Sequence, residues 1–169
     1  MIRFIAAIDS MRGLATDSGI PWDLPSDHAY YVNRVKSGSI LMGYNTYLNH
    51  KALLHGGPEY VATTRSERLR QGFVPISNID SFLENKRCTW VLGGSKLFES
   101  LLNKADELYI TQVNGDFQCS VFFPAFEKDF HLVAKSKIKT ENGIDFQYQI
   151  WRSNRLLSQK VQKSLDSDE

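Results

Sequence analysis

The chain has little that would tie it to a disulfide framework, a metal, a nucleic acid or a membrane. Its 169 residues hold two cysteines, Cys88 and Cys119, without CxxC spacing, which predicts two reduced thiols in a cytoplasmic protein. The four histidines show no metal-ligand spacing with each other or with the cysteines. Lysine and arginine number 20 against 19 aspartates and glutamates, so no basic excess favours nucleic acid. No apolar run reaches the length of a membrane span or a signal-peptide core.

Several signatures of enzyme classes are also missing. The chain has no paired carboxylates, no nucleophile elbow and no Walker phosphate loop. Its Gly93-Gly94 pair is not a GxGxxG fingerprint, so an ordinary Rossmann dehydrogenase is not supported. With 42% apolar and 23% charged residues, the composition is that of a soluble globular protein. The length suits one domain with a tail.

The hydrophobic pattern predicts strands alternating with helices. Strands are expected at residues 2–8, 39–43, 59–64, 73–76, 88–92, 107–113, 131–138 and 146–151. Helices are expected at 25–36, 45–54, 77–85 (capped by Ser77) and 95–103, and a loop at 9–19. Pro75 places its strand at an edge of the sheet, and Asn142-Gly143 is expected to join the last two strands into an antiparallel pair. The sequence thus predicts an α/β domain over 1–154, followed by a polar tail over 155–169 that is a frayed helix or disordered.

The segment from Pro21 to Asp27 is the most informative part of the chain. Its two prolines predict an extended turn, and Pro25 suits the first turn of a helix. Asp27 then lies near the positive end of that helix, and Tyr31, four residues later, shares its face. With Trp22 just upstream, these residues suit a flat, nitrogen-rich ring. The alternative is that Asp27 only begins the helix and that Trp22 and Tyr31 are core residues.

Two further segments suit phosphate groups. Val91 to Ser95 reads as a strand, two glycines and a helix start, which lets a backbone approach a phosphate closely, although a plain tight connection has the same pattern. Thr63-Thr64-Arg65 offers two hydroxyls and a guanidinium to a phosphate monoester such as the one that distinguishes NADPH from NADH. Its alternative is a solvated strand end.

Together these segments resemble the dihydrofolate reductase family over residues 1–153. The resemblance is carried by Ile5-Ala6-Ala7, the run from Gly19 to Asp27, the run from Leu41 to Thr46, Gly93-Gly94, the run from Leu108 to Thr111, and Phe123-Pro124. It implies an eight-stranded, mostly parallel central sheet with an antiparallel C-terminal edge, flanked by about four helices. It also implies that 7,8-dihydrofolate is reduced to tetrahydrofolate by NADPH, with hydride transfer to C6 and protonation at N5.

The resemblance also implies roles for individual residues. Asp27 would accept two N–H bonds from the pterin, Thr111 would support Asp27 through its hydroxyl, and Trp22 would belong with Ile20 to a mobile loop over 9–24. The catalytic set is Asp27, Trp22 and Thr111. The substrate-binding set is Ile5, Ala6, Ile20, Asp27, His28, Tyr31, Leu92 and Thr111. The cofactor-binding set is Ala7, Leu14, Gly43, Tyr44, Asn45, Thr46, Thr63, Thr64, Arg65, Leu92, Gly93, Gly94, Ser95, Lys96, Leu97 and Phe98.

The chain departs from the family pattern at several positions. Gly57 stands where relatives use an arginine to hold the substrate's glutamate tail, Tyr44 replaces a frequent basic residue, and Ser120 replaces an aspartate that steadies the mobile loop. Two alternatives stay open: a related reductase acting on another pterin or on a pyrimidinone of riboflavin synthesis, and a non-catalytic module that binds NADPH or folate. A monomer acting on a small molecule, with no metal, is expected in each case.

Overall fold

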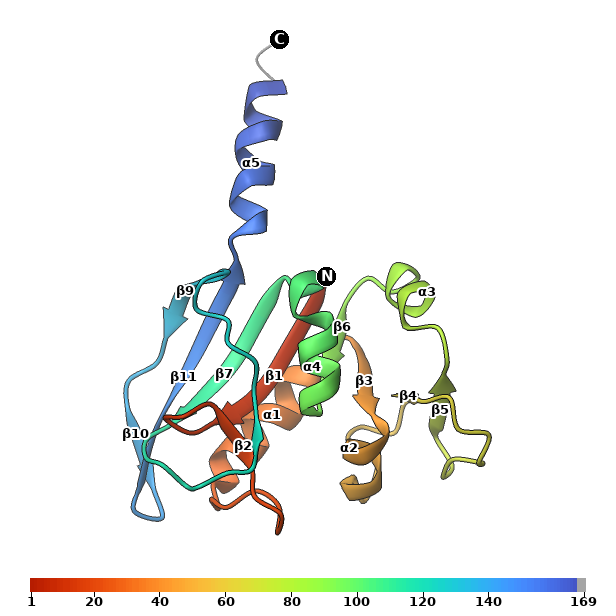
Figure 1. The fold of residues 1–169 in the computed structure, drawn as a ribbon, viewed down its shortest axis with the longest axis vertical. Helices are drawn as coiled ribbons and strands as arrows, with labels where there is room; N and C mark the ends of the chain where they lie inside the picture. Colours follow the sequence, from red (N-terminus) through yellow and green to blue (C-terminus); the bar gives the residue numbers. More distant parts are fainter. Residues whose placement is uncertain (167–169) are drawn as a thin grey trace.

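A central sheet organises the molecule in the computed structural model, which describes residues 1–166. The strand order is β10-β11-β7-β1-β6-β3-β4-β5, and β9 also pairs with β11 (Figure 1). The parallel strands are β1 (Ile2–Ile8), β3 (Ser39–Gly43), β4 (Glu59–Ala62), β5 (Phe73–Ile76), β6 (Thr89–Val91) and β7 (Glu107–Val113). The antiparallel edge is made by β9 (Phe130–Lys135), β10 (Lys139–Glu141) and β11 (Ile144–Ser153). A separate two-stranded sheet pairs β2 (Gly13–Ala15) with β8 (Val121–Phe122).

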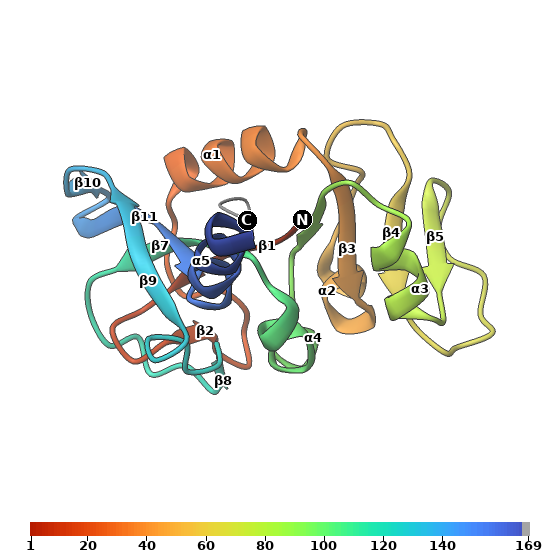
Figure 2. The ribbon, with the colours of Figure 1, turned by 90° about the horizontal axis from the view of Figure 1, so that it is seen from above.

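Helices cover the two faces of the central sheet, as Figure 2 shows from above. They are α1 (Pro25–Val35), α2 (Tyr44–Asn49), α3 (Ile79–Glu84) and α4 (Ser95–Leu101), with a 3-10 turn at Leu102–Lys104, and a fifth helix, α5 (Arg155–Asp166), follows β11. One core cluster, containing Ile5, Val35 and Trp90, lies on the α1 face. Another, containing Phe4, Phe98 and Leu108, lies on the α4 face. Because β1, β6 and β7 are packed on both sides, most of their residues are apolar.

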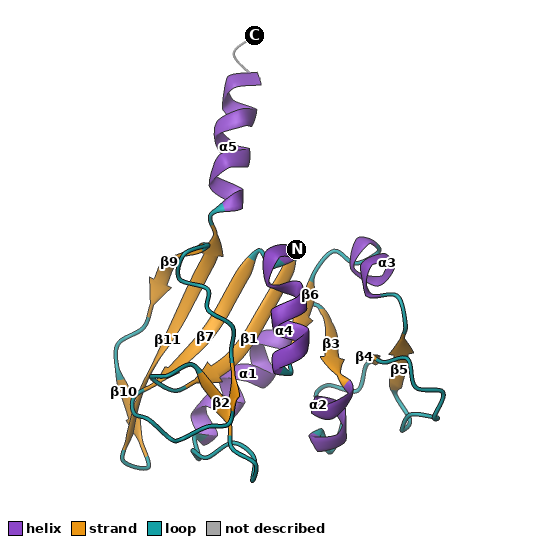
Figure 3. Cartoon of the chain, in the orientation of Figure 1, coloured by secondary structure: helices purple, strands orange, loops and turns teal. Residues whose placement is uncertain are grey.

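The expected α/β fold with a mostly parallel sheet and an antiparallel edge is confirmed. The sheet path has eight strands, β9 adds a ninth off that path, and the described residues hold five α-helices instead of about four. Pro75 lies, as expected, on the edge strand β5. Figure 3 shows how short many of these elements are.

Several predicted boundaries were wrong. The loop expected at 9–19 contains β2, and the helix expected at 45–54 ends at Asn49. The helix expected from Ser77 is instead capped by Asn78, whose side chain accepts from the Ser81 N–H at 2.9 Å. The Asn142-Gly143 turn joins the unpredicted strand β10 to β11, not β9 to β11.

The chain leaves the sheet at α5. Figure 1 shows this helix extending away from the body beyond the end of β11. The polar tail expected over 155–169 is therefore helical as far as Asp166, and residues 167–169 lie outside the described residues.

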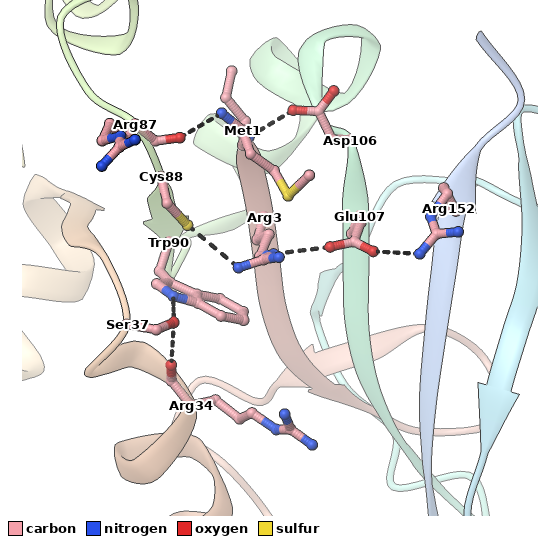
Figure 4. Close-up of polar contacts among 11 residues, drawn as sticks. Met1, Arg3, Arg34, Ser37, Arg87, Cys88, Trp90, Asp106, Glu107 and Arg152 are labelled. Carbon is pink, nitrogen blue, oxygen red and sulfur yellow. Dashed lines mark hydrogen bonds and ion pairs between the residues drawn. The ribbon is translucent and has the colours of Figure 1, made fainter. Parts of the chain in front are cut away.

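An ion network around the buried Glu107 ties three strands together where β1 and β7 begin. Figure 4 shows Glu107 between Arg3 and Arg152. Its carboxylate accepts from Arg3 Nε at 2.8 Å and from Arg152 Nη2 at 3.1 Å, and its side chain is only 6% exposed. The Arg3 guanidinium also lies 5.4 Å from the centre of the Trp90 ring. Because Glu107 is the shared acceptor of both arginines, its charge holds β1, β7 and β11 in register.

We expect Glu107→Gln to lower the free energy of unfolding by about 1.5–3 kcal/mol, the range for hydrogen bonds to charged groups. The matched control is Glu127→Gln, because Glu127 is 53% exposed and lies 3.9 Å from Arg12, so its pair should contribute less than about 1 kcal/mol. Urea unfolding followed by circular dichroism measures both. Equal effects of the two substitutions would contradict the assignment.

Candidate active site

Asp27 lies in the first turn of α1 and contacts the sheet from there. Pro25 occupies the start of the helix, directly after the N-cap residue Leu24. The Thr111 hydroxyl on β7 donates to Asp27 Oδ1 at 2.5 Å. These residues are 84 positions apart in the sequence, so this bond docks the beginning of α1 on the C-terminal half of β7. The structure thereby brings two of the three expected catalytic residues into direct contact.

The surroundings of Asp27 disfavour its charge. Burial raises the pKa of the Asp27 carboxyl above its ordinary value, and the Thr111 hydroxyl and nearby His28 only partly oppose that effect. Glu141 adds a further, smaller rise. A ligand that offers N–H groups to this carboxyl would supply the stabilisation that water provides at an exposed aspartate. The site is therefore suited to a cationic or amidine-like ring edge.

Tyr148 is a neighbour of the site that the sequence did not single out. It lies opposite Thr111 in the register of β11 and β7, and its ring stacks on Tyr30 with centroids 4.0 Å apart. Burial, with a contribution from the Asp27 charge, raises the pKa of Tyr148 to about 12. Its only sequence signal was its place in an alternating strand, because the register that pairs it with Thr111 is set by distant residues.

The expected apolar wall is partly assembled on the α1 face. Ile5, Tyr31 and Leu92 pack in the same cluster. Ala6 instead packs against the cluster on the α4 face, because neighbouring residues of a strand point to opposite sides. Ile20 is 67% exposed in the loop before α1, and the exposed His28 has its ring centroid 6.0 Å from that of Tyr31.

Trp22 is a packed side chain, only 8% exposed. It lies in a cluster with Leu24, Val113 and Phe146, against which Ala7 also packs. Its ring meets that of Phe117 edge to face at 5.3 Å. The structure therefore shows the packing role that the sequence offered as the alternative for Trp22, and it places this residue beside β1 and β7.

The loop over 9–24 is fastened by Asp9, a residue that no sequence pattern singled out. The Asp9 carboxylate accepts from the N–H groups of Met11, Gly13 and Phe117 at 2.7–3.0 Å. Burial works against its charge, but these bonds dominate and lower the pKa of Asp9. Ser120 also steadies the loop, since its hydroxyl donates to Asp17 Oδ1 at 2.9 Å. The serine at position 120, where the family pattern has an aspartate, therefore still contacts the loop through a hydrogen bond.

The glycines expected to line a cofactor meet at the ends of β3 and β6. The Gly43 N–H donates to the Gly93 carbonyl at 2.7 Å, and the Gly93–Gly94 peptide is cis. Gly93 has a φ of +119°, and a Cβ added there would lie 3.3 Å from Phe98, so a side chain is disfavoured. A Cβ at Gly94 would lie 3.4 Å from the Thr46 hydroxyl oxygen. Gly43 and Gly94 are partly exposed, so backbone rather than side chains forms the surface at this edge.

The remaining cofactor candidates divide between core and surface. Leu97 and Phe98 are buried in the α4-face cluster, with Leu14 packed against it, so their side chains support the glycine edge from behind. Ser95 begins α4 and is partly exposed, whereas Lys96 and Asn45 are exposed on their helices.

Arg65 lies at the surface beyond the end of β4. Its N–H donates to the Thr63 hydroxyl at 3.1 Å, and its guanidinium lies 4.3 Å from the centre of the Tyr44 ring. Thr64, between them in sequence, is exposed. Because β3 and β4 are parallel, Tyr44, Thr63 and Arg65 lie at the same end of the strands as the glycine edge.

Comparison with known proteins identifies the family. A sequence profile of the family described as dihydrofolate reductase matches residues 1–155. The chain is 30% identical over 155 residues to the dihydrofolate reductase of Bacillus subtilis. This match covers 88% of this chain and 92% of that protein. The chain belongs to the dihydrofolate reductase family.

The chain is also similar to other proteins and to a solved structure. Dihydrofolate reductase of Staphylococcus aureus is 27% identical over 147 residues, covering 85% of this chain and 92% of that protein. A segregation and condensation protein A of Mycoplasmoides gallisepticum is 27% identical over 146 residues, but the match covers only 23% of that longer protein. A solved dihydrofolate reductase from Enterococcus faecalis, complexed with NADP(H) and RAB-propyl, shares the fold with a TM-score of 0.80 at 21% identity, covering 91% of this chain and 96% of that one.

Gly57 is a departure from the dihydrofolate reductase pattern whose surroundings are now visible. Its φ lies outside the left-handed region, and a Cβ there would meet only His55 at 3.9 Å, so a side chain would fit. The segment over 50–58 is held instead by Glu59, which is fully buried. Glu59 accepts from the Leu54 N–H at 2.7 Å and lies 3.1 Å from His50 Nε2. Position 57 therefore offers no cation, and a buried carboxyl group and a histidine hold the neighbouring segment.

We expect Asp27→Asn to stabilise the fold at neutral pH relative to the parent. The raised pKa of Asp27 means that the folded state holds the proton more tightly than the unfolded state. The parent therefore loses stability as pH rises from the unfolded value, about 3.9, through the folded one. An asparagine side chain does not titrate, so the advantage of the variant should grow with pH across that window and be smallest below it.

Urea unfolding at a series of pH values from 3 to 7 measures this difference. Asp23→Asn, which removes an exposed carboxylate four residues earlier, is the matched control and should show no such growth. A difference between parent and Asp27→Asn that is constant across the series would contradict the raised pKa.

Proposed function

We propose that this chain reduces 7,8-dihydrofolate to 5,6,7,8-tetrahydrofolate with NADPH, by hydride transfer to C6 and protonation at N5. Membership of the dihydrofolate reductase family supports the reaction. The observation that carries the proposal at the level of residues is the half-buried carboxyl of Asp27, bonded to Thr111 beside the cluster of Ile5, Tyr31 and Leu92.

Asp27 is proposed as the group that recognises the pterin. Its free oxygen and the one bonded to Thr111 would accept two parallel N–H bonds from the 2-amino edge of the ring, a bidentate charge-assisted pair. Because the carboxyl lies in a poorly solvated site, ligand charge and Asp27 charge stabilise each other strongly. The carboxylate thereby favours the protonated pterin, which is the better hydride acceptor.

The residues present fit NADPH at the adjoining edge of the sheet. Gly43 and Gly94 are partly exposed and carry no side chain, and the Gly43 N–H donates to the Gly93 carbonyl at 2.7 Å, so a dinucleotide could approach the backbone closely at this edge. Arg65, 57% exposed, would bind the 2′-phosphate with Thr63 and Thr64. The bound cofactor supplies the hydride. The loop carrying Ile20 and Trp22, fastened through Asp9, would cover the reacting rings and exclude water.

The nature of the substrate beyond its pterin ring is a further proposal. With glycine at 57 and the carboxyl group of Glu59 buried, a glutamate tail would gain little binding energy here. Pterins without a glutamate tail should therefore bind almost as well as dihydrofolate. Another pterin, or a pyrimidinone, remains the alternative substrate. A non-catalytic binding module is disfavoured because the Asp27–Thr111 pair is intact.

We also propose that the chain acts on small molecules as a monomer in the cytoplasm, without nucleic acid. The net charge of +1 supports the last point, and both cysteines are free. No helix among the described residues is long and apolar enough to cross a membrane. We retain residues 1–154 as the functional domain and 155–169 as an appendage.

The first test compares turnover on dihydrofolate, dihydrobiopterin and the riboflavin-pathway pyrimidinone, followed by the loss of NADPH absorbance. Dihydrofolate should be reduced, and Asp27→Asn should lower that turnover by roughly a hundredfold or more near neutral pH. Binding of NADPH should be retained in the variant. Reduction of the pyrimidinone alone would contradict the proposed substrate. Near-full activity of Asp27→Asn would contradict the proposed role of Asp27.

The second test concerns the cofactor. A guanidinium paired with a phosphate contributes about 1.5–3 kcal/mol, a roughly tenfold to hundredfold preference for NADPH over NADH. Because Tyr44 stands where a second basic residue is frequent, we expect the low end. Arg65→Ala should bring the ratio of kcat/KM values close to one, whereas Arg68→Ala, at a nearby exposed position, should leave it unchanged. No effect of Arg65→Ala would place the phosphate elsewhere.

A further inference from the structure

Glu67 lies beside Arg65, the residue proposed to bind the 2′-phosphate. Tyr44 begins α2, and its hydroxyl donates to Glu67 Oε2 at 2.9 Å. The Arg65 guanidinium lies over the Tyr44 ring, with Nη1 3.9 Å from Glu67 Oε1. The three side chains therefore form one cluster, in which the tyrosine positions both the cation and the anion.

This arrangement gives Arg65 an anionic partner before any ligand arrives. Glu67 and Arg65 are more than half exposed, so their mutual attraction is weak and the pair opens readily. A phosphate monoester bound to Arg65 would nevertheless lie close to the Glu67 carboxylate, and like charges at that range oppose binding. Glu67 thus weakens the contribution of the 2′-phosphate.

The same carboxylate suits a cofactor without that phosphate. Dinucleotide sites that accept a free ribose bind its 2′-hydroxyl with a carboxylate, whereas those that accept the 2′-phosphate use an arginine. This cluster holds one of each, joined through Tyr44. We propose that Glu67 is a specificity-determining residue that lets the adenosine end of the site accept NADH as well as NADPH. The proposal rests on the proposed function, because it takes Arg65 as the partner of the 2′-phosphate.

Calorimetric titration with two fragments tests this without depending on turnover. AMP and adenosine 2′,5′-bisphosphate differ only by the 2′-phosphate, so the ratio of their dissociation constants reports recognition of that group. Glu67→Gln keeps the shape of the side chain and removes its charge. It should raise the preference for the bisphosphate about fivefold, as expected for one like-charge contact near the surface. The NADPH to NADH ratio of kcat/KM should rise by a similar factor.

Two further variants separate the possible failures. Glu84→Gln, an exposed glutamate on α3, makes the same change in net charge and should leave the preference unchanged. Arg65→Gln should abolish the preference. If Arg65→Gln does so but Glu67→Gln has no effect, or no more effect than Glu84→Gln, the role of Glu67 is wrong and the phosphate site stands. If Arg65→Gln changes nothing, the proposed phosphate site is wrong, and the role of Glu67 falls with it.

Discussion

The hydrogen bond from Thr111 to Asp27 is the contact on which the site depends. It joins the first turn of α1 to β7 across 84 positions of sequence and fixes a carboxyl group in a place where burial raises its pKa. A carboxyl without that hydroxyl would be left poorly solvated and unpartnered. With it, one oxygen is oriented and the group stays available to a ligand. The neighbouring aromatic stack of Tyr30 on Tyr148 closes the same side of the sheet.

Two different surfaces lie along the sheet, an apolar one beside Asp27 and one formed by glycine backbone. The α1 face, lined by Ile5, Tyr31 and Leu92, is apolar and offers one carboxyl group. The ends of β3 and β6 offer backbone, because Gly43 and Gly93 meet there. Parallel strands bring their carboxyl ends to one edge, which is where α/β sheets bind ligands. Far from this edge, the buried Glu107 network at the start of β1 and β7 carries stability rather than chemistry.

Local sequence was sufficient to predict an element where residues within that element determine its structure. Two prolines and a helix-start carboxylate placed α1 and Asp27 correctly, and Pro75 identified an edge strand. Sequence was insufficient where distant residues decide. Tyr148 reaches the site through the register of β11 on β7, and Asp9 fastens its loop through Phe117, 108 positions away. The helix predicted over 45–54 ends at Asn49, and the segment that follows is held by Glu59.

A carbon-13 NMR titration of the Asp27 carboxyl, in the free protein and with a 2,4-diaminopteridine bound, tests the role of this residue without mutation. We expect a pKa above that of an ordinary aspartate in the free protein, because burial outweighs the Thr111 bond. We expect a pKa well below the ordinary value in the complex, because a protonated ring then pairs with the carboxylate. An ordinary or lowered pKa in the free protein, or one that the ligand leaves unchanged, would show that Asp27 is not the group that recognises the pterin.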